Sequence, residues 1–326
     1  MTAFKNTDLW YRTVKIPDDA RFTYFFQVNR PLKFSPNADR GKVLAAPRPD
    51  PLNPRTISSQ DGSLMELPGA PPQPWLERAP GLPQRRPSEH SIKSEILKQE
   101  RTFTIYTPPN YDPNGEACRV LILFDGPDFQ RNDEIPAPVI LDNLISEKKI
   151  PPVVAVFVNH LDRNKELACL EPFADFVSKE LVPWVVSHFH ASADAKNTII
   201  GGVSRGGMMA AYCAFRHSET FGNVLSLSGS YWWFPGADGK PATSNLEPGW
   251  LTRQFLTARC LPVRFYLSAG RFEHGYPVSL LSENRRLRDV LETKGYPVKY
   301  SEFSGGHDYI CWRSPFVEGL MALAGM

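Results

Sequence analysis

The sequence predicts an α/β protein: a mainly parallel sheet with helices on both faces, preceded by a short all-β segment. The main observation is that, beyond Ser91, continuous apolar runs ended by turn residues alternate with stretches of helical periodicity. Buried strands that alternate with helices are typical of a parallel sheet covered on both faces. The second observation is an N-terminal segment of short alternating or aromatic pieces, which a cluster of prolines separates from the rest.

Residues 1–67 form the first predicted unit. The pieces "WYRTVKI", from Trp10, and "FTYFFQV", from Phe22, have the alternating or aromatic character of strands. "DPLNPR" at 50–55 is rich in turn residues. A core of fewer than about 70 residues contributes little net stability. We therefore expect a small all-β domain, or part of one, whose core is thin for a domain standing alone.

Residues 68–90 form a proline-rich linker. The chain has 31 prolines, and they cluster in "PGAPPQPWLERAPGLPQRRP" at 68–87. Such a stretch can form neither a helix nor a central strand, and it is expected to be a stiff, extended connector. Residues 91–326 then form the large α/β domain.

The large domain is expected to hold the chemistry at the carboxyl ends of its strands, in the loops that follow them. Its strands are expected at 101–108, 119–126, 152–160, 197–204, 223–230, 263–270 and 298–306. Its helices are expected at 137–148, 173–189, 208–216, 251–258, 282–294 and 316–324.

Composition argues against several classes of function. The 326 residues carry a formal charge of +2, so nothing suggests a nucleic-acid partner. No run of about 18 apolar residues would span a membrane, and the N-terminus lacks the apolar core of a signal peptide. Five cysteines, an odd number, fit reduced thiols better than disulfides. We expect a cytoplasmic protein without a membrane partner and, lacking CxxC or HExxH spacing, without a metal site.

The segment 202–206, "GVSRG", matches the G-x-S-x-G nucleophile elbow. It follows an apolar strand and precedes a helix, as this motif requires, so it predicts an α/β-hydrolase-type sheet with Ser204 as nucleophile. The elbow needs small residues because the serine backbone is strained and the strand and helix approach closely. The alternative is a glycine-rich turn in which Ser204 has no chemical role.

A serine nucleophile needs a base, and in this architecture the acid and then the histidine follow it in the chain. His307 lies in a glycine-loosened loop after the last predicted strand and is the predicted base, with His274 as the alternative. Glu273, a few residues after the preceding strand, is the predicted acid. Asp308 is a second candidate, and the absence of a functioning acid is a third possibility.

An oxyanion hole needs backbone N–H groups aimed where negative charge develops. The amide of Arg205, directly after the nucleophile, is one predicted donor. The loop after the early strand offers Gly126 or a near neighbour as the other, with a simple turn as the alternative role for this glycine.

Several motifs resemble the enterochelin (enterobactin) esterase family of α/β-hydrolases. Besides the elbow, they are "LSLSGSYWW" at 225–233, "GGHDYICWR" at 305–313, "DRNKELACLEPFADFVSKELVPW" at 162–184 and "DPLNPR" at 50–55. The resemblance runs from about Trp10 to the end of the chain. It implies family roles for Ser204 and His307, and it aligns Glu273 with the family's G-x-x-E position.

The resemblance also implies a substrate. Family members hydrolyse the ester bonds of a cyclic or linear trimer of 2,3-dihydroxybenzoyl-serine, usually with iron bound, and need no cofactor beyond this iron. Such a catecholate siderophore is a bulky anion with aromatic rings. The predicted ring contacts are Tyr231, Trp232 and Trp233, and the predicted cationic contacts are Arg163 and Arg205. Core packing for at least one aromatic residue and a solvated surface charge for Arg163 are the alternatives.

Two departures from the family leave alternatives open. The family's β-sandwich-like N-terminal domain normally has several more strands before the piece that begins at Trp10, so 1–67 resembles a truncated version of it. Arg205 stands where a small or aromatic residue is expected. An esterase acting on other aromatic or carbohydrate esters, such as feruloyl or acetyl esters, is therefore the nearest rival. A non-catalytic siderophore-binding protein is the second.

Overall fold

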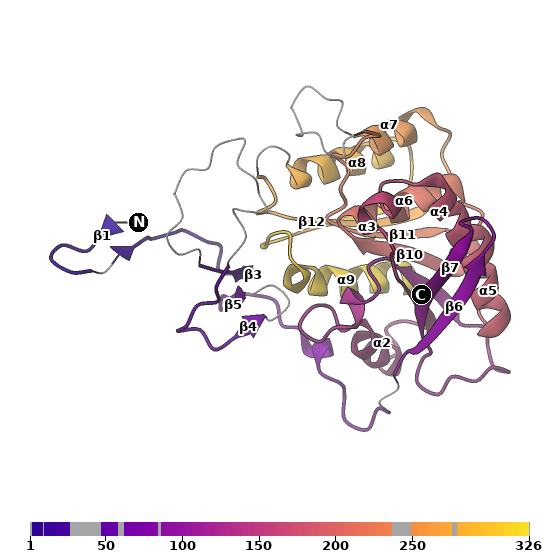
Figure 1. The fold of residues 1–326 in the computed structure, drawn as a ribbon, viewed down its shortest axis with the longest axis horizontal. Coiled ribbons are helices and arrows are strands. Elements are labelled where there is room, and N and C mark those ends of the chain that lie inside the picture. Colours follow the sequence, from indigo (N-terminus) through magenta and orange to yellow (C-terminus); the bar gives the residue numbers. More distant parts are fainter. Residues whose placement is uncertain are drawn as a thin grey trace.

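An eight-stranded sheet forms the centre of the molecule (Figure 1). The computed structural model describes residues 2–8, 10–26, 47–57, 62–83, 86–236, 249–275 and 279–325. From edge to edge the strands are β13 (Val298–Phe303), β12 (Arg264–Gly270), β11 (Asn223–Leu227), β10 (Thr198–Val203), β8 (Arg119–Leu123), β9 (Val153–Val158), β7 (Gln99–Tyr106) and β6 (Ser88–Ser94).

The sheet is parallel from β13 to β9, β7 pairs antiparallel with β9, and β6 pairs antiparallel with β7. This confirms the predicted α/β-hydrolase-type, mainly parallel sheet. Each expected strand is present within or close to its expected range. Strand β6 was not predicted, because this edge strand is largely polar and mostly exposed and so lacks an apolar pattern.

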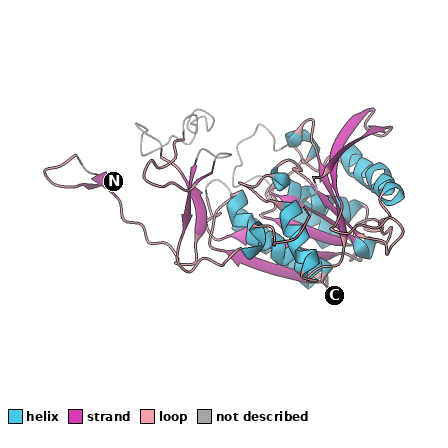
Figure 2. Cartoon of the chain, turned by 90° about the horizontal axis from the view of Figure 1, so that it is seen from below, coloured by secondary structure: helices cyan, strands magenta, loops and turns pink. Residues whose placement is uncertain are grey.

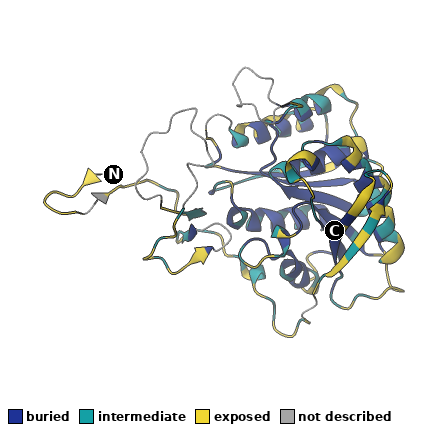
Figure 3. Ribbon diagram, viewed as in Figure 1, coloured by how far each residue is buried: buried dark blue, intermediate teal, exposed yellow. Residues whose placement is uncertain are grey.

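Helices cover both faces of the sheet because its strands bury apolar side chains on both. Along β8, Val120 and Ile122 join one core, and Leu121 and Leu123 join the other. The first core includes side chains of α4 (Glu171–Phe176), α5 (Val182–His188), α6 (Arg205–Arg216), α7 (Trp250–Thr257) and α8 (Leu280–Thr293); the second includes those of α2 (Ala137–Ser146) and α9 (Tyr309–Ala324). The sheet is accordingly buried throughout its centre (Figure 3).

The largest differences between predicted and observed helices are at 173–189 and 316–324. The expected helix at 173–189 comprises α4, a π-helical turn (Val177–Leu181) and α5 in succession. The last helix, α9, begins at Tyr309 because the Asp308 carboxylate accepts the Ile310 amide and caps it. A short helix, α3 (Arg163–Glu166), follows β9 and was not expected.

The N-terminal segment is all-β, as predicted (Figure 2). A hairpin of β1 (Thr2–Ala3) and β2 (Trp10–Tyr11) is followed by a three-stranded sheet in the order β3 (Arg21–Tyr24), β5 (Gly62–Glu66) and β4 (Thr56–Ile57). The strand expected over 10–16 covers only its first two residues, and that expected over 22–28 ends at Tyr24, with 27–28 outside the described residues.

The proline-rich segment packs along α2. Trp75 and Leu76, in a 3₁₀ turn (Pro74–Leu76), pack against the core beneath α2. The Asn143 side chain donates to the carbonyls of Trp75 and Glu77 and accepts from the Ala79 amide. This connector is therefore held along its path rather than extended through solvent. Within the described residues, no helix is both long and apolar enough to cross a membrane.

Candidate active site

Ser204 lies at the sharp turn between β10 and α6, with φ 55° and ψ −119°. Two glycines permit this turn. A Cβ on Gly202 would lie 2.8 Å from the carbonyl carbon of Gly206, so the strand and helix could not approach as they do. A Cβ on Gly206 would in turn lie 3.3 Å from the side chain of Phe124. The strained serine is therefore held out from the sheet by close packing beneath it.

Ser204, His307 and Glu273 form one chain of hydrogen bonds. Ser204 Oγ lies 2.9 Å from His307 Nε2, and His307 Nδ1 lies 2.9 Å from Glu273 Oε1. The other Glu273 oxygen accepts the Gly270 amide at 3.0 Å, and the carboxylate is buried. Because a carboxylate only accepts, Nδ1 carries the imidazole proton and Nε2 is free to accept the serine proton. The structure thus brings together the three residues predicted as the triad.

The two alternative residues are engaged elsewhere. The Asp308 carboxylate accepts the Ile310 amide through Oδ1 and the Thr23 amide through Oδ2, both at 2.9 Å. His274 Nδ1 lies 2.8 Å from the carbonyl of Arg271. Each of these side chains therefore stabilises the local backbone.

The N-terminal segment fastens the loop that carries His307. On one side of this histidine, the Ser304 carbonyl accepts the Arg21 amide at 3.1 Å. On the other side, Asp308 accepts the Thr23 amide. Two residues of β3 therefore hold the imidazole loop from both sides.

Three neighbouring strands end at residues with positive φ that are not glycine. They are Asp125 after β8 (57°), Ser204 after β10 (55°) and Ser228 after β11 (49°). Such conformations are costly for residues with a Cβ and persist only where the surroundings enforce them. Their grouping places three strained residues at the carboxyl end of the parallel strands, where Ser204 lies.

The amides of the two predicted oxyanion donors have different surroundings in the structure. Arg205 is the first residue of α6. Its amide therefore belongs to the first turn, whose N–H groups have no carbonyl acceptor within the helix. The Gly126 amide instead donates to the Val158 carbonyl at 3.1 Å. A Cβ on Gly126 would lie 2.5 Å from the carbonyl carbon of Phe157. This glycine is thus needed for close packing against β9, which corrects its predicted role.

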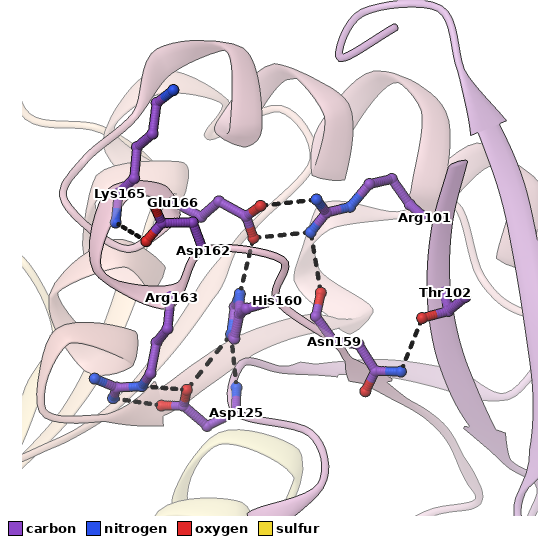
Figure 4. A network of polar contacts seen from close by, with 9 residues as sticks. All are labelled: Arg101, Thr102, Asp125, Asn159, His160, Asp162, Arg163, Lys165 and Glu166. Carbon is purple, nitrogen blue, oxygen red and sulfur yellow. Dashed lines mark hydrogen bonds and ion pairs between the residues drawn. The ribbon is translucent and has the colours of Figure 1, made fainter. Parts of the chain in front are cut away.

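A buried network of charges holds the loop after β8 (Figure 4). The Asp125 amide donates to His160 Nε2 at 3.0 Å, and His160 Nδ1 lies 3.2 Å from Glu166. Glu166 forms a bidentate pair with Arg101 at 2.7 and 2.8 Å. The Asp125 carboxylate pairs in the same way with Arg163 at 2.6 and 2.8 Å. His160 thus links the two ion pairs, because Nε2 accepts the Asp125 amide and Nδ1 faces Glu166.

Arg101 and Glu166 were not predicted from the sequence. Burial raises the pKa of Glu166, but the hydrogen bonds from His160 and Arg101 outweigh it and lower the pKa to about 2. Arg101 and Glu166 are 65 residues apart in the chain, so no local pattern could have paired them. The only indication of this pair in the sequence was a charged residue, Arg101, at the start of an apolar strand.

The predicted aromatic contacts are mostly core residues. Tyr231 is completely buried and donates to Ser226 Oγ at 2.7 Å. Trp233 is buried edge-on against Trp250. Tyr231 has no exposed surface and Trp233 is only 4% exposed, so both rings pack in the core, which corrects the predicted substrate contacts for both. Trp232 is only partly buried and remains a candidate.

The predicted cationic side chains lie at the same edge of the sheet as the serine. Arg163 is partly exposed, but its charge is offset by Asp125. Arg205 extends toward α3 and donates to the Asn164 carbonyl at 3.0 Å. Both guanidinium groups therefore belong to the surroundings of Ser204.

A serine at an elbow, an acid after a later strand and a histidine after the last strand define the serine-hydrolase class of the α/β-hydrolase fold. Residues 94–323 match the putative esterase family, and residues 1–76 match the N-terminal domain of enterochelin esterase. The iron(III) enterobactin esterase of Escherichia coli O6:H1 (strain CFT073) is 32% identical over 99% of this chain and 81% of the relative.

Solved structures agree. The enterobactin esterase of Shigella flexneri, crystallised in the presence of enterobactin, is similar with a TM-score of 0.77 and 30% identity, over 99% of this chain and 83% of that one. The ferric enterobactin esterase of Salmonella typhimurium gives a TM-score of 0.80 and 29% identity with the same coverage. The chain belongs to the enterochelin (enterobactin) esterase family and is a carboxylic ester hydrolase. The resemblance seen in the sequence is thereby confirmed.

Proposed function

We propose that this protein is a serine esterase that hydrolyses the ester bonds of enterobactin-type catecholate siderophores and so releases their iron. The observation that carries the proposal is the continuous hydrogen-bond chain from Ser204 through His307 to Glu273. Family membership and the named activity of the relatives support the choice of substrate.

In the proposed reaction, His307 Nε2 accepts the Ser204 proton as Oγ attacks the ester carbonyl. The carbonyl π electrons pass to oxygen, and Glu273 stabilises the resulting imidazolium. The tetrahedral intermediate then expels the seryl alkoxide of the substrate, which takes the proton from Nε2. Water repeats the sequence on the acyl-enzyme, which yields the carboxylic acid and restores the Ser204 hydroxyl.

The proposed chemistry uses protein groups alone, and iron belongs to the substrate. Among the described residues, no group of three or more His, Cys, Asp or Glu side chains is arranged to hold a metal ion. Arg163, Arg205 and Trp232 are the proposed contacts for the anionic, aromatic ligand. We place the reaction in the cytoplasm, because the five cysteines are unpaired thiols, of which four are buried.

The test compares wild type with Ser204→Ala on ferric enterobactin and on methyl ferulate, with products separated by chromatography. The proposal expects wild type to release dihydroxybenzoyl-serine fragments, with a higher kcat/KM on the siderophore. Ser204→Ala should bind ferric enterobactin and leave it intact. Turnover by this variant would refute the mechanism, and a preference for the ferulate would instead favour an aromatic-ester hydrolase. A wild type that binds without any turnover would favour a binding protein.

A further inference from the structure

Ser230 lies in the loop after β11, directly beside the nucleophile. Its hydroxyl oxygen is 3.1 Å from Ser204 Oγ, and its side chain is almost completely buried. We infer that Ser230 is a further catalytic residue, whose hydroxyl donates to Ser204 Oγ and stabilises the negative charge that this atom carries during ester cleavage. The inference rests on the proposed role of Ser204 as nucleophile.

The direction of this hydrogen bond follows from the triad. Because His307 Nδ1 donates to Glu273, His307 Nε2 must be an acceptor. The single hydroxyl proton of Ser204 is therefore donated to Nε2. Ser204 Oγ can then only accept from its other neighbour. The hydroxyl of Ser230 is therefore the donor, with its proton aimed at the attacking oxygen.

A donor in this position acts in both halves of the reaction. As His307 removes the Ser204 proton, charge develops on Oγ before it passes to the carbonyl oxygen of the ester. When the acyl-enzyme breaks down, Oγ is the leaving atom and regains that charge. Ser230 keeps its own proton throughout, so it stabilises both steps without entering the proton balance.

The loop after β8 explains why a side-chain donor is valuable here. This loop was expected to supply the second oxyanion amide, but across 124–128 every backbone N–H is used within the protein, and Pro127 has none. The amides of Phe124, Asp125, Gly126 and Asp128 donate respectively to Gly201 O (3.0 Å), His160 Nε2 (3.0 Å), Val158 O (3.1 Å) and Asp125 O (3.0 Å). The Ser230 hydroxyl is a donor beside Ser204 that does not come from this loop, and it acts on Oγ rather than on the carbonyl oxygen.

The Ser230 hydroxyl is also held rigidly, as a donor to a transition state must be. The loop 228–230 is bonded at every residue to a different element. The Ser230 amide donates to Ser204 O (3.0 Å), Asn284 of α8 donates to Gly229 O (2.9 Å), and Trp312 of α9 donates to Ser228 Oγ (2.8 Å).

The test replaces this one hydroxyl and compares it with a matched one. Ser230→Ala should lower kcat by about 10–100-fold, with KM nearly unchanged, because the lost donor acts on developing charge. Ser268→Ala is the control. Its hydroxyl is equally buried in β12 but has no hydrogen-bond partner among the described residues, so this variant should retain the wild-type kcat.

The rate of inactivation by a fluorophosphonate separates this inference from the choice of substrate. The probe reports on Ser204 nucleophilicity whatever the natural ester is. A wild type that reacts with the probe but ignores enterobactin, together with a slower Ser230→Ala, would support Ser230 and reject the proposed substrate. Equal inactivation rates for wild type and folded Ser230→Ala would overturn the inference. Should the alanine variant unfold, Ser230→Cys preserves the shape with a weaker donor, and the same comparison decides.

Discussion

The backbone amide of Thr23 and the carboxylate of Asp308, 285 residues apart in the chain, are joined by a hydrogen bond of 2.9 Å. One residue earlier, the Phe22 ring packs edge-on against Phe272, with 5.9 Å between the ring centres. Phe272 precedes the Glu273 carboxylate, as Asp308 follows the His307 imidazole. A single N-terminal strand thus supports both loops that complete the triad.

The first prediction concerns a variant that removes this support. Thr23→Pro deletes the amide that Asp308 accepts, at an edge strand where proline is tolerated. Loss of a hydrogen bond to a charged group should cost about 1.5–3 kcal/mol of stability, and the loosened His307 should lower kcat. Thr23→Val is the control, because it retains the amide and removes only a buried hydroxyl without a partner among the described residues. Urea unfolding and esterase kinetics measure both effects, and equal kcat values for the two variants would argue against support from β3.

The second prediction tests the acid. Glu273→Gln should reduce kcat by about 10³–10⁴-fold, because an amide N–H can donate to His307 Nδ1 and favour the wrong tautomer. Asp308→Asn alters the other nearby carboxylate, which faces the backbone, and should reduce kcat by less than about tenfold. Steady-state kinetics at neutral pH compare the two variants. A larger loss from the Asp308 substitution would reverse the assignment.

The third prediction concerns the buried pair behind the β8 loop. Arg101→Met leaves the Glu166 carboxylate buried without its main partner, which should cost about 3–5 kcal/mol of unfolding free energy. The double variant Arg101→Met, Glu166→Leu removes the stranded charge and should recover much of that loss. Urea titrations of the three proteins give the comparison. A double variant no more stable than the single one would mean that packing, not charge, governs the cost.

The fourth prediction concerns pH. The pKa of Glu166 is about 2 in the folded protein, lower than in the unfolded chain, so the folded state favours the ionised form. Its contribution of roughly 3 kcal/mol is present at neutral pH and is lost as pH falls from about 4.5 toward 2. Glu166→Gln should therefore be less stable at pH 7 but lose less stability on acidification. Thermal unfolding between pH 7 and pH 3 measures the difference, and parallel curves would contradict this account.

Much of the architecture could be predicted because its signals are local. The parallel strands are continuous apolar runs since both faces are buried, and the segment around Ser204 combines a strand end, small residues and a helix start. His307 and Glu273 could be predicted because each follows a strand whose carboxyl end must lie at the same edge. Their mutual contact needed the fold.

The failures concern features that depend on distant parts of the chain. Tyr231 and Trp233 come after the end of a strand, where exposed loop residues are expected. The loop turns inward, however, and both rings are buried in the core. Gly126 was expected to present its amide, and the approach of β9 determined its role instead. The pairing of Arg101 with Glu166 joins a strand and a helix, a relationship that no local periodicity records.

The long separation between nucleophile and base has a consequence for biosynthesis. After Ser204 has been added to a nascent chain, the ribosome must add another 103 residues to reach His307. Even then, that loop must fold back onto β3, whose Thr23 precedes Asp308 by 285 residues. In the proposed mechanism, nascent and prematurely terminated chains therefore carry a serine without its base.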